Sequence, residues 1–348
     1  MADKDFSEYA LNVDRQAMAD TGPAILGEGD YRYEVSGANW GNLPEGWYYK
    51  EATSVAINSS GQVYVFNRGS HQMLILDRDG NVDSWWSDAS FGVPHGVTIG
   101  PDDSIFCVDV GDSTVRKFTG DGKLLMTLGT PHQPAGKMSG QPFCVPTHVA
   151  IDTRTAEFYV ADGYSNARVH KYDPNGNYLF SWGESGTGDG QFNIVHNIDT
   201  DSNGWVYIAD RENQRVQIFS PEGKYEAQWN NLSRVAALHI DSSGDEEVIY
   251  LGEYFCGIGS NDTGTDLGPR VTIMSLDGKV LGRAGRQSYG DETGRFYSPH
   301  GLAVDANGDV YVAEVSWSDY GSQMDPPREL EVRLFLGAGI LETVPQEQ

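Results

Sequence analysis

The chain repeats one pattern of apolar and polar positions six times. Each copy has a short apolar strand, a turn rich in Asp, Ser, Asn and Gly, and a second strand similar to "VYVAD". Most copies continue into a third strand with a tight glycine turn, such as "VHKYDPNGN", and a fourth strand that ends near Trp or Gly, such as "YLFSWG". Four antiparallel strands per unit, repeated about every 40 to 60 residues, predict an all-β fold, a six-bladed β-propeller. The copies begin at Ser54, Gly96, His148, Asn197, Leu238 and Gly301.

The two ends of the chain bear on how the ring closes. The sixth copy reaches "LEVRLFLG" and lacks a fourth strand, whereas the N-terminal "YRYEVSGANWG" resembles the end of a blade. Pairing the two would close the ring and remove exposed strand edges. We therefore expect a single propeller domain over residues 30–348, with an N-terminal strand closing the ring, preceded by an irregular arm over residues 1–29.

Histidines recur in one position of the repeat. Aligning the copies by their first strand places His95, His196 and His300 in the second, fourth and sixth units, at the residue that enters the innermost strand. Alternate units of a six-membered ring are about 120° apart, so the three imidazoles should converge on the central axis. The alternative is that they are loop histidines whose ring nitrogens bond to backbone groups.

Convergence would suit a divalent metal ion held by three neutral imidazoles, with a fourth position open, as in catalytic zinc sites. Zinc is the default, but imidazole also suits iron, manganese, copper and nickel. Loops that enter the first strand and leave the second lie on the same face of a blade, because consecutive strands run in opposite directions. Further functional side chains are expected on that face.

Charge narrows the set of partners. Fifty acidic and 24 basic residues among 348 give a formal charge of −26, which would repel nucleic acid and anionic membranes. A small-molecule substrate is the remaining expectation. The acidic N-terminus is unlike a signal peptide and no apolar run reaches membrane-spanning length, so we expect a cytoplasmic protein; its oligomeric state is open.

Several motifs resemble those of the peptidyl-alpha-hydroxyglycine alpha-amidating lyases, within the broader group of NHL-repeat propellers. The similarity covers roughly residues 50 to 315. Its most specific motifs are "FNRG", "VPHGV", "FCVPTHVAI", "VADGYSNARVHKY", "YIADRENQRVQIF" and "SPHGL". The resemblance implies that His95, His196 and His300 bind a catalytic zinc.

The resemblance also implies roles for residues that leave second strands. It makes Tyr164 the catalytic base, Arg68 an active-site arginine and Arg211 a further arginine of the substrate pocket. A nearby dication and guanidinium would favour the phenolate of Tyr164, which could then take a proton from a substrate hydroxyl. An arginine could hold a substrate carboxylate by paired hydrogen bonds. The alternative is that "ADGYSN" and "ADREN" are ordinary blade turns.

Departures from the family pattern concern the substrate pocket. Ser298 stands where peptide-acting members have methionine, and Gly301 replaces an aspartate that contacts a structural calcium, so a calcium site is in doubt. His148 replaces another aspartate and is a candidate for substrate binding, facing either the neighbouring strand or the pocket. Glu253 and Glu314 leave the second strands of the fifth and sixth units and could act as acid or base, although a solvated carboxylate is the simpler interpretation.

Together these features predict a metal-dependent lyase acting on a hydroxylated small molecule. One alternative is a metal-dependent hydratase or hydrolase that uses metal-bound hydroxide. A second alternative is a non-enzymatic propeller that serves as a binding platform.

Overall fold

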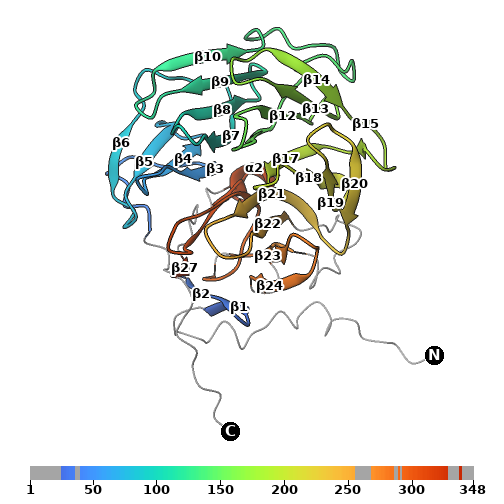
Figure 1. Ribbon diagram of the computed structural model, residues 1–348. Coiled ribbons are helices and arrows are strands. Elements are labelled where there is room, and N and C mark those ends of the chain that lie inside the picture. The colour runs from blue at the N-terminus through green and yellow to red at the C-terminus, as the bar shows by residue number, and fades with distance from the viewer. Residues whose placement is uncertain are drawn as a thin grey trace, which may run out of the picture.

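A computed structural model describes residues 25–35, 40–254, 268–285, 289–290, 292–327 and 337–338. Five four-stranded antiparallel sheets stand as blades around one axis (Figure 1). In the first three blades the strands are β3 (Ala52–Ile57), β4 (Val63–Asn67), β5 (Met73–Leu76) and β6 (Val82–Trp85); β7 (Pro94–Ile99), β8 (Ile105–Asp109), β9 (Thr114–Phe118) and β10 (Leu124–Leu128); and β11 (His148–Ile151), β12 (Phe158–Asp162), β13 (Arg168–Tyr172) and β14 (Tyr178–Trp182). In the fourth and fifth they are β17 (Val195–Thr200), β18 (Val206–Asp210), β19 (Arg215–Phe219) and β20 (Tyr225–Trp229); and β21 (Arg234–Asp241), β22 (Val248–Tyr254), β23 (Arg270–Ser275) and β24 (Val280–Ala284).

The prediction of six four-stranded blades is wrong in number: the described residues form five. In the sixth sector, β25 (Pro299–Val304) and β26 (Val310–Glu314) form a two-stranded sheet. Strand β25 lies against β21 on one side and β3 on the other, so six innermost strands surround the axis. The third strand expected over "LEVRLFLG" lies outside the described residues, except at its end.

The N-terminal strand pairs with the C-terminal segment, as expected, although the two lie in a sheet of their own. Strand β2 (Tyr31–Val35) pairs with β27 (Gly337–Ala338), so the two ends of the chain do pair, but in a separate three-stranded sheet with β1 (Ile25–Glu28). The arm is therefore not irregular up to residue 29, since residues 25–28 are a strand. The physical reason is burial: Leu26 and Val35 pack on the apolar side chains of the fifth blade and of β25 and β26.

Apolar side chains between adjacent blades form the core. Phe66 of the first blade meets Phe91 at the entrance to the second, with ring centroids 4.7 Å apart. Phe192 packs in the same way between the third and fourth blades. Each fully buried aromatic of this kind contributes about 2 to 3 kcal/mol of transfer free energy, which holds the blades at fixed angles.

Short elements link the blades. The two-residue strands β15 (Glu184–Ser185) and β16 (Gln191–Phe192) pair in parallel ahead of the fourth blade. The helical turns are η2 (Arg211–Asn213), α2 (Ser316–Asp319) and η3 (Gly321–Gln323). Within the described ranges, no helix has the length and apolar character needed to cross a membrane.

Candidate metal centre and active site

A β-bulge sets the direction of each histidine. The register of β7 shifts between Pro94 and Val97, that of β17 between Val195 and Asn197, and that of β25 between Pro299 and Gly301. His95, His196 and His300 occupy these bulges. A bulged residue has no ladder partner and its side chain is turned out of the alternating pattern, here toward the axis.

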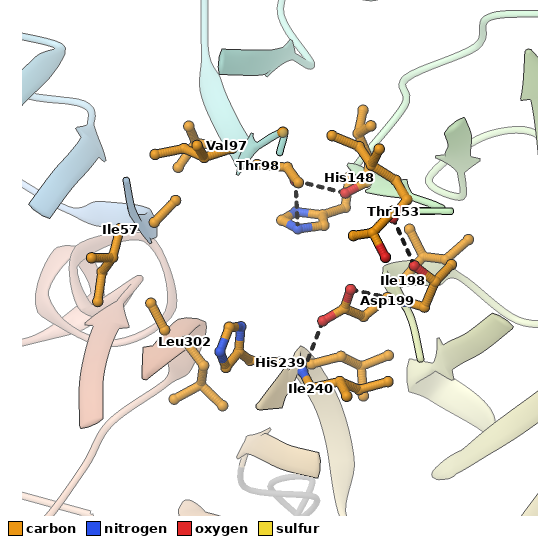
Figure 2. A pocket seen from close by; sticks show the side chains of 18 of the residues that line it. Ile57, Val97, Thr98, His148, Thr153, Ile198, Asp199, His239, Ile240 and Leu302 are labelled. Atoms are coloured by element: carbon orange, nitrogen blue, oxygen red, sulfur yellow. Dashed lines mark hydrogen bonds between the residues drawn. The ribbon is translucent and has the colours of Figure 1, made fainter. Parts of the chain in front are cut away.

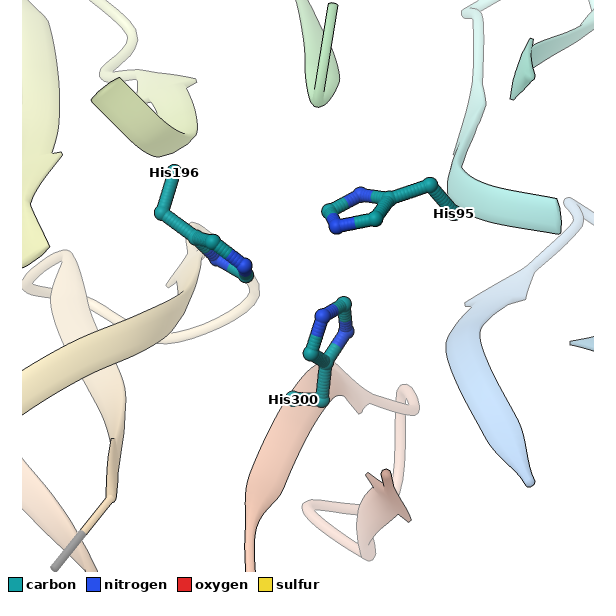
Figure 3. A group of neighbouring side chains, drawn as sticks. All are labelled: His95, His196 and His300. Atoms are coloured by element: carbon teal, nitrogen blue, oxygen red, sulfur yellow. The ribbon is translucent and has the colours of Figure 1, made fainter. Parts of the chain in front are cut away.

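The three imidazoles meet at the axis, as predicted (Figure 3). Their centroids are 5.0 Å apart for His95 and His196, 4.6 Å for His95 and His300, and 4.7 Å for His196 and His300. One ligand atom from each lies within 4.8 Å of the others, and all three residues are buried. Every other innermost strand therefore contributes one donor to a single point.

Backbone carbonyls fix the tautomer of each ring. The Nδ1 atoms of His95 and His196 lie 2.7 Å from the carbonyl oxygens of Thr147 and Ala236. The Nδ1 atom of His300 lies 2.6 Å from the carbonyl oxygen of Thr53. Because a carbonyl only accepts, each Nδ1 carries the proton and each Nε2 presents a lone pair.

These carbonyls come from the same repeat position as the histidines. Thr53, Thr147 and Ala236 occupy it in the first, third and fifth units. The alternative in which the ring nitrogens bond only to the backbone therefore describes Nδ1 alone and leaves Nε2 facing the axis. In histidines that bind a metal ion through one ring nitrogen, the other ring nitrogen usually donates to a backbone carbonyl or a carboxylate.

The hydroxyl of Tyr164 completes the cluster. It lies 2.9 Å from Nε2 of His95 and 3.0 Å from Nε2 of His196. A phenol has one proton, so it can satisfy only one of these two lone pairs, and His300 adds a third. Three converging lone pairs with one proton among them are a donor set that fits a divalent cation.

Burial keeps the imidazoles neutral. Desolvation lowers the pKa of His95 and of His196 well below the ordinary value, and it lowers the pKa of His300 to about 3. Nearby guanidiniums act in the same direction. The three imidazoles are therefore unprotonated at neutral pH.

For Tyr164 the same burial raises the pKa, while Arg211 and Arg68 lower it. The guanidiniums thus favour the phenolate as expected, but desolvation has the larger effect on the protein alone. Deprotonation at neutral pH needs an additional positive charge at the three imidazoles.

Arg68 is fixed by a buried acid. Its Nη1 lies 2.7 Å from Oε2 of Glu51, which is 1% exposed, and its Nε donates to the carbonyl of Pro94 at 3.3 Å. Since Pro94 precedes His95, Arg68 is tied to the strand entrance that carries this histidine. Sequence reasoning missed Glu51, which has no counterpart in the repeat pattern.

Arg211 lies between two tyrosine rings. Its guanidinium carbon is 5.6 Å from the ring centroid of Tyr164 and 5.8 Å from that of Tyr254. Tyr254 was not predicted, yet it follows Glu253 just as Arg68 follows Asn67 and Arg211 follows Asp210. Its position in the repeat could have identified it. Its ring is 6.1 Å from that of His300.

Glu253 and Glu314 are buried structural groups rather than solvated carboxylates. Glu253 accepts hydrogen bonds from the backbone of Ser233 and from Arg270. Glu314 accepts them from the backbone nitrogens of Tyr297, at 2.6 Å, and Ser298, at 2.9 Å. Both hold the loop entering the first strand of their unit through these hydrogen bonds.

The two remaining candidates, Ser298 and His148, lie in different places. The Oγ of Ser298 donates to Oδ2 of Asp319 at 3.1 Å, beside the bulge that carries His300. His148 instead contacts Thr98, with 3.3 Å between Nε2 and Oγ1, and lines a cavity of about 430 Å³ in the central channel (Figure 2). Neither the three histidines nor Tyr164 lines that cavity.

The expected doubt about calcium has a steric basis. A Cβ atom at Gly301 would lie 2.6 Å from the Cα of Ser54. An aspartate cannot occupy this position without moving the first blade, so the residues present do not fit that calcium site.

A family model described as NHL repeat matches residues 192–219 and 296–318, which contain two of the three histidines. Peptidyl-alpha-hydroxyglycine alpha-amidating lyase 1 of Drosophila melanogaster is 32% identical over 76% of this chain and 55% of its own length. The chain thus contains sequence that matches NHL repeats and is similar to amidating lyases. A probable lyase of the same kind from Caenorhabditis elegans is 27% identical, over 82% of this chain and 83% of its own length.

The NHL-repeat relatives include proteins whose names carry no activity. NHL repeat-containing protein 3 of Homo sapiens is 33% identical over 58% of this chain and 60% of its own length. The chain thus spans somewhat more than half of the fly and human relatives. Among solved structures, virginiamycin B lyase from Staphylococcus aureus has a TM-score of 0.51 at 14% identity, over 78% of this chain and 79% of that one. Streptogramin B lyase has a TM-score of 0.50, also at 14%, over 75% of each chain. At this identity the likeness concerns the fold alone.

Proposed function

We propose that this NHL-repeat protein is a metal-dependent lyase acting on a hydroxylated small molecule. One observation carries the proposal: three unprotonated imidazole nitrogens and one phenol converge at the axis, with two arginines beside the phenol. The similarity to amidating lyases supports the reaction type.

His95, His196 and His300 would hold the ion, with zinc as the first candidate. When bound, a dication would polarise a substrate oxygen and favour the phenolate of Tyr164. The remaining roles belong to the chain itself. Tyr164 takes the proton of the substrate hydroxyl, and Arg68 and Arg211 orient the substrate by their guanidinium groups.

The name of the amidating-lyase relatives implies cleavage of the C–N bond of an N-acyl-α-hydroxyglycine, and the atoms and electrons of this reaction balance as follows. The hydroxyl proton passes to the Tyr164 phenolate, the C–O bond becomes a carbonyl, and the C–N bond breaks with its electron pair going to nitrogen. The nitrogen then takes a proton, which gives an amide and glyoxylate. We infer that the substrates of this protein share this chemistry and carry the hydroxyl and the leaving nitrogen on the same carbon.

Tyr164→Phe tests the proposal in protein purified without an affinity tag and loaded with zinc. N-benzoyl-α-hydroxyglycine is the probe, and glyoxylate release and bound zinc are both measured. A loss of about 10³-fold or more in kcat with zinc retained supports the phenolic base. Tyr178→Phe is the matched control, because this tyrosine is 50% exposed.

The two rival functions predict other results. A hydratase or hydrolase would lose little activity in Tyr164→Phe, because it needs no phenolic base. A binding platform would show neither turnover nor stoichiometric metal in the unmodified protein.

A further inference from the structure

Three arginines near the histidine cluster form ion pairs with only two glutamates. Arg68 is paired with Glu51 at 2.7 Å. Arg211 and Arg234 both contact Glu212, through Nε atoms at 2.8 Å and 3.0 Å from its two oxygens. The ion pairs therefore leave one positive charge in excess on the Arg211 and Arg234 side.

Stacking holds this excess charge in place. Tyr254 lies between the two arginines, with its ring centroid 5.8 Å from the guanidinium carbon of Arg211 and 5.7 Å from that of Arg234. Tyr164 covers the other side of Arg211. Guanidiniums stacked on aromatic faces lose little further freedom when they bind an anion.

A carboxylate without an ion pair among the described residues lies close enough to Arg211 and Arg234 to interact with their charges. Asp319 ends helix α2, next to Ser318, whose Oγ is 3.0 Å from Oε2 of Glu51. The Oγ of Ser298 donates a hydrogen bond to Oδ2 of Asp319 at 3.1 Å, and among the described residues no lysine, arginine or histidine lies within ion-pair distance of this carboxylate. Partial desolvation raises the pKa of Asp319, and the hydrogen bond from Ser298 and the charges on Arg211 and Arg234 oppose this rise. Part of its side chain remains exposed to solvent.

We propose that Asp319 determines specificity by binding a protonated amine or a hydroxyl on a dipolar substrate whose anionic end lies at Arg211. The assignment of the reacting end rests on the proposed function. A substrate with a carboxylate alone would bring a second negative charge toward Asp319. A dipolar substrate instead matches the excess positive charge and the unpaired negative charge together.

Binding of nonreactive ligands tests this assignment separately from turnover. The probes are ω-amino carboxylates with one to five methylenes, each compared with the alkyl carboxylate that has methyl in place of ammonium. Affinities for the zinc-loaded protein are measured by calorimetry. We expect at least one amino carboxylate to bind about 10-fold more tightly than its alkyl counterpart, the range of one partly desolvated ion pair.

Asp319→Asn should abolish this preference, because the amide keeps an acceptor for Ser298 and loses the charge. Ser298→Ala should retain it, as should Asp245→Asn, which changes the same net charge at an exposed site. The proposal is overturned if no length shows a preference, if Asp319→Asn keeps it, or if Ser298→Ala loses it too. If the protein prefers the amino carboxylate but does not turn over N-benzoyl-α-hydroxyglycine, the lyase proposal is rejected and the role of Asp319 stands. If it turns over N-benzoyl-α-hydroxyglycine but shows no such preference, the role of Asp319 is rejected and the lyase proposal stands.

Discussion

The Arg68–Glu51 pair should contribute measurably to stability, and Glu51→Gln is the perturbation that shows it. Opposite charges 2.7 Å apart attract by about 6 kcal/mol at an effective dielectric constant of about 20. Most of this is offset by desolvating Glu51, which is 1% exposed. Arg68 keeps 20% of its exposure, so water can replace part of the lost partner. We expect Glu51→Gln to lower the free energy of unfolding by about 2 kcal/mol.

Urea unfolding at fixed pH and salt measures the effect, and a double-mutant cycle with Arg68→Gln isolates the coupling. Glu226→Gln is the control, since its pair with Lys224 has the same 2.7 Å separation at 35% and 75% exposure and should be worth under about 0.5 kcal/mol. A coupling energy for Arg68 and Glu51 no larger than this control would refute the electrostatic account.

Three further changes have defined outcomes. His196→Ala should lower bound zinc from one equivalent to nearly none after dialysis, by elemental analysis, whereas the exposed-loop variant His132→Asn should keep it. The pKa of His239 is lowered by burial to about 4, below the unfolded value, so its contribution to stability is complete above about pH 6.5 and is lost as the pH falls toward 4. Between pH 7 and pH 4.5 the free energy of unfolding should therefore fall by about 1 to 2 kcal/mol less in His239→Gln than in the parent protein, as measured by urea unfolding. An equal fall in both proteins would contradict this. Gly301→Ala should destabilise by about 1 to 3 kcal/mol, because its Cβ would lie 2.6 Å from the Cα of Ser54, while Gly136→Ala, with 3.7 Å to its nearest neighbour, should not shift the melting temperature.

The repeat position of the histidines could be predicted from sequence because it depends on register alone. Aligning the first strands was enough to place His95, His196 and His300 on alternate strands. In a closed ring, side chains from alternate strands converge on the axis. The bulges that turn them inward leave no separate mark in the composition of the strands. The carbonyl partners were beyond prediction, since every residue has a carbonyl and only the fold decides which one faces Nδ1.

Side chains joined across distant segments were the least predictable. Glu51 meets Ser318 of α2, and Asp319 meets Ser298, through loops whose paths no periodicity fixes. Glu253 and Glu314 were misjudged for a different reason. The shorter Asp109 and Asp210 hold loop backbones from the same repeat position, but a glutamate there suggested a solvated group. The sixth blade was overcounted because the chain supplies only two described strands of its own to that sector.

The bond from His300 to the carbonyl of Thr53 joins the last innermost strand to the first. An ion shared by His95, His196 and His300 would therefore help to hold together the seam between β25 and β3. Removing it should loosen that seam before the other junctions, so hydrogen exchange should rise first in β3 and β25 when the protein is treated with a chelator.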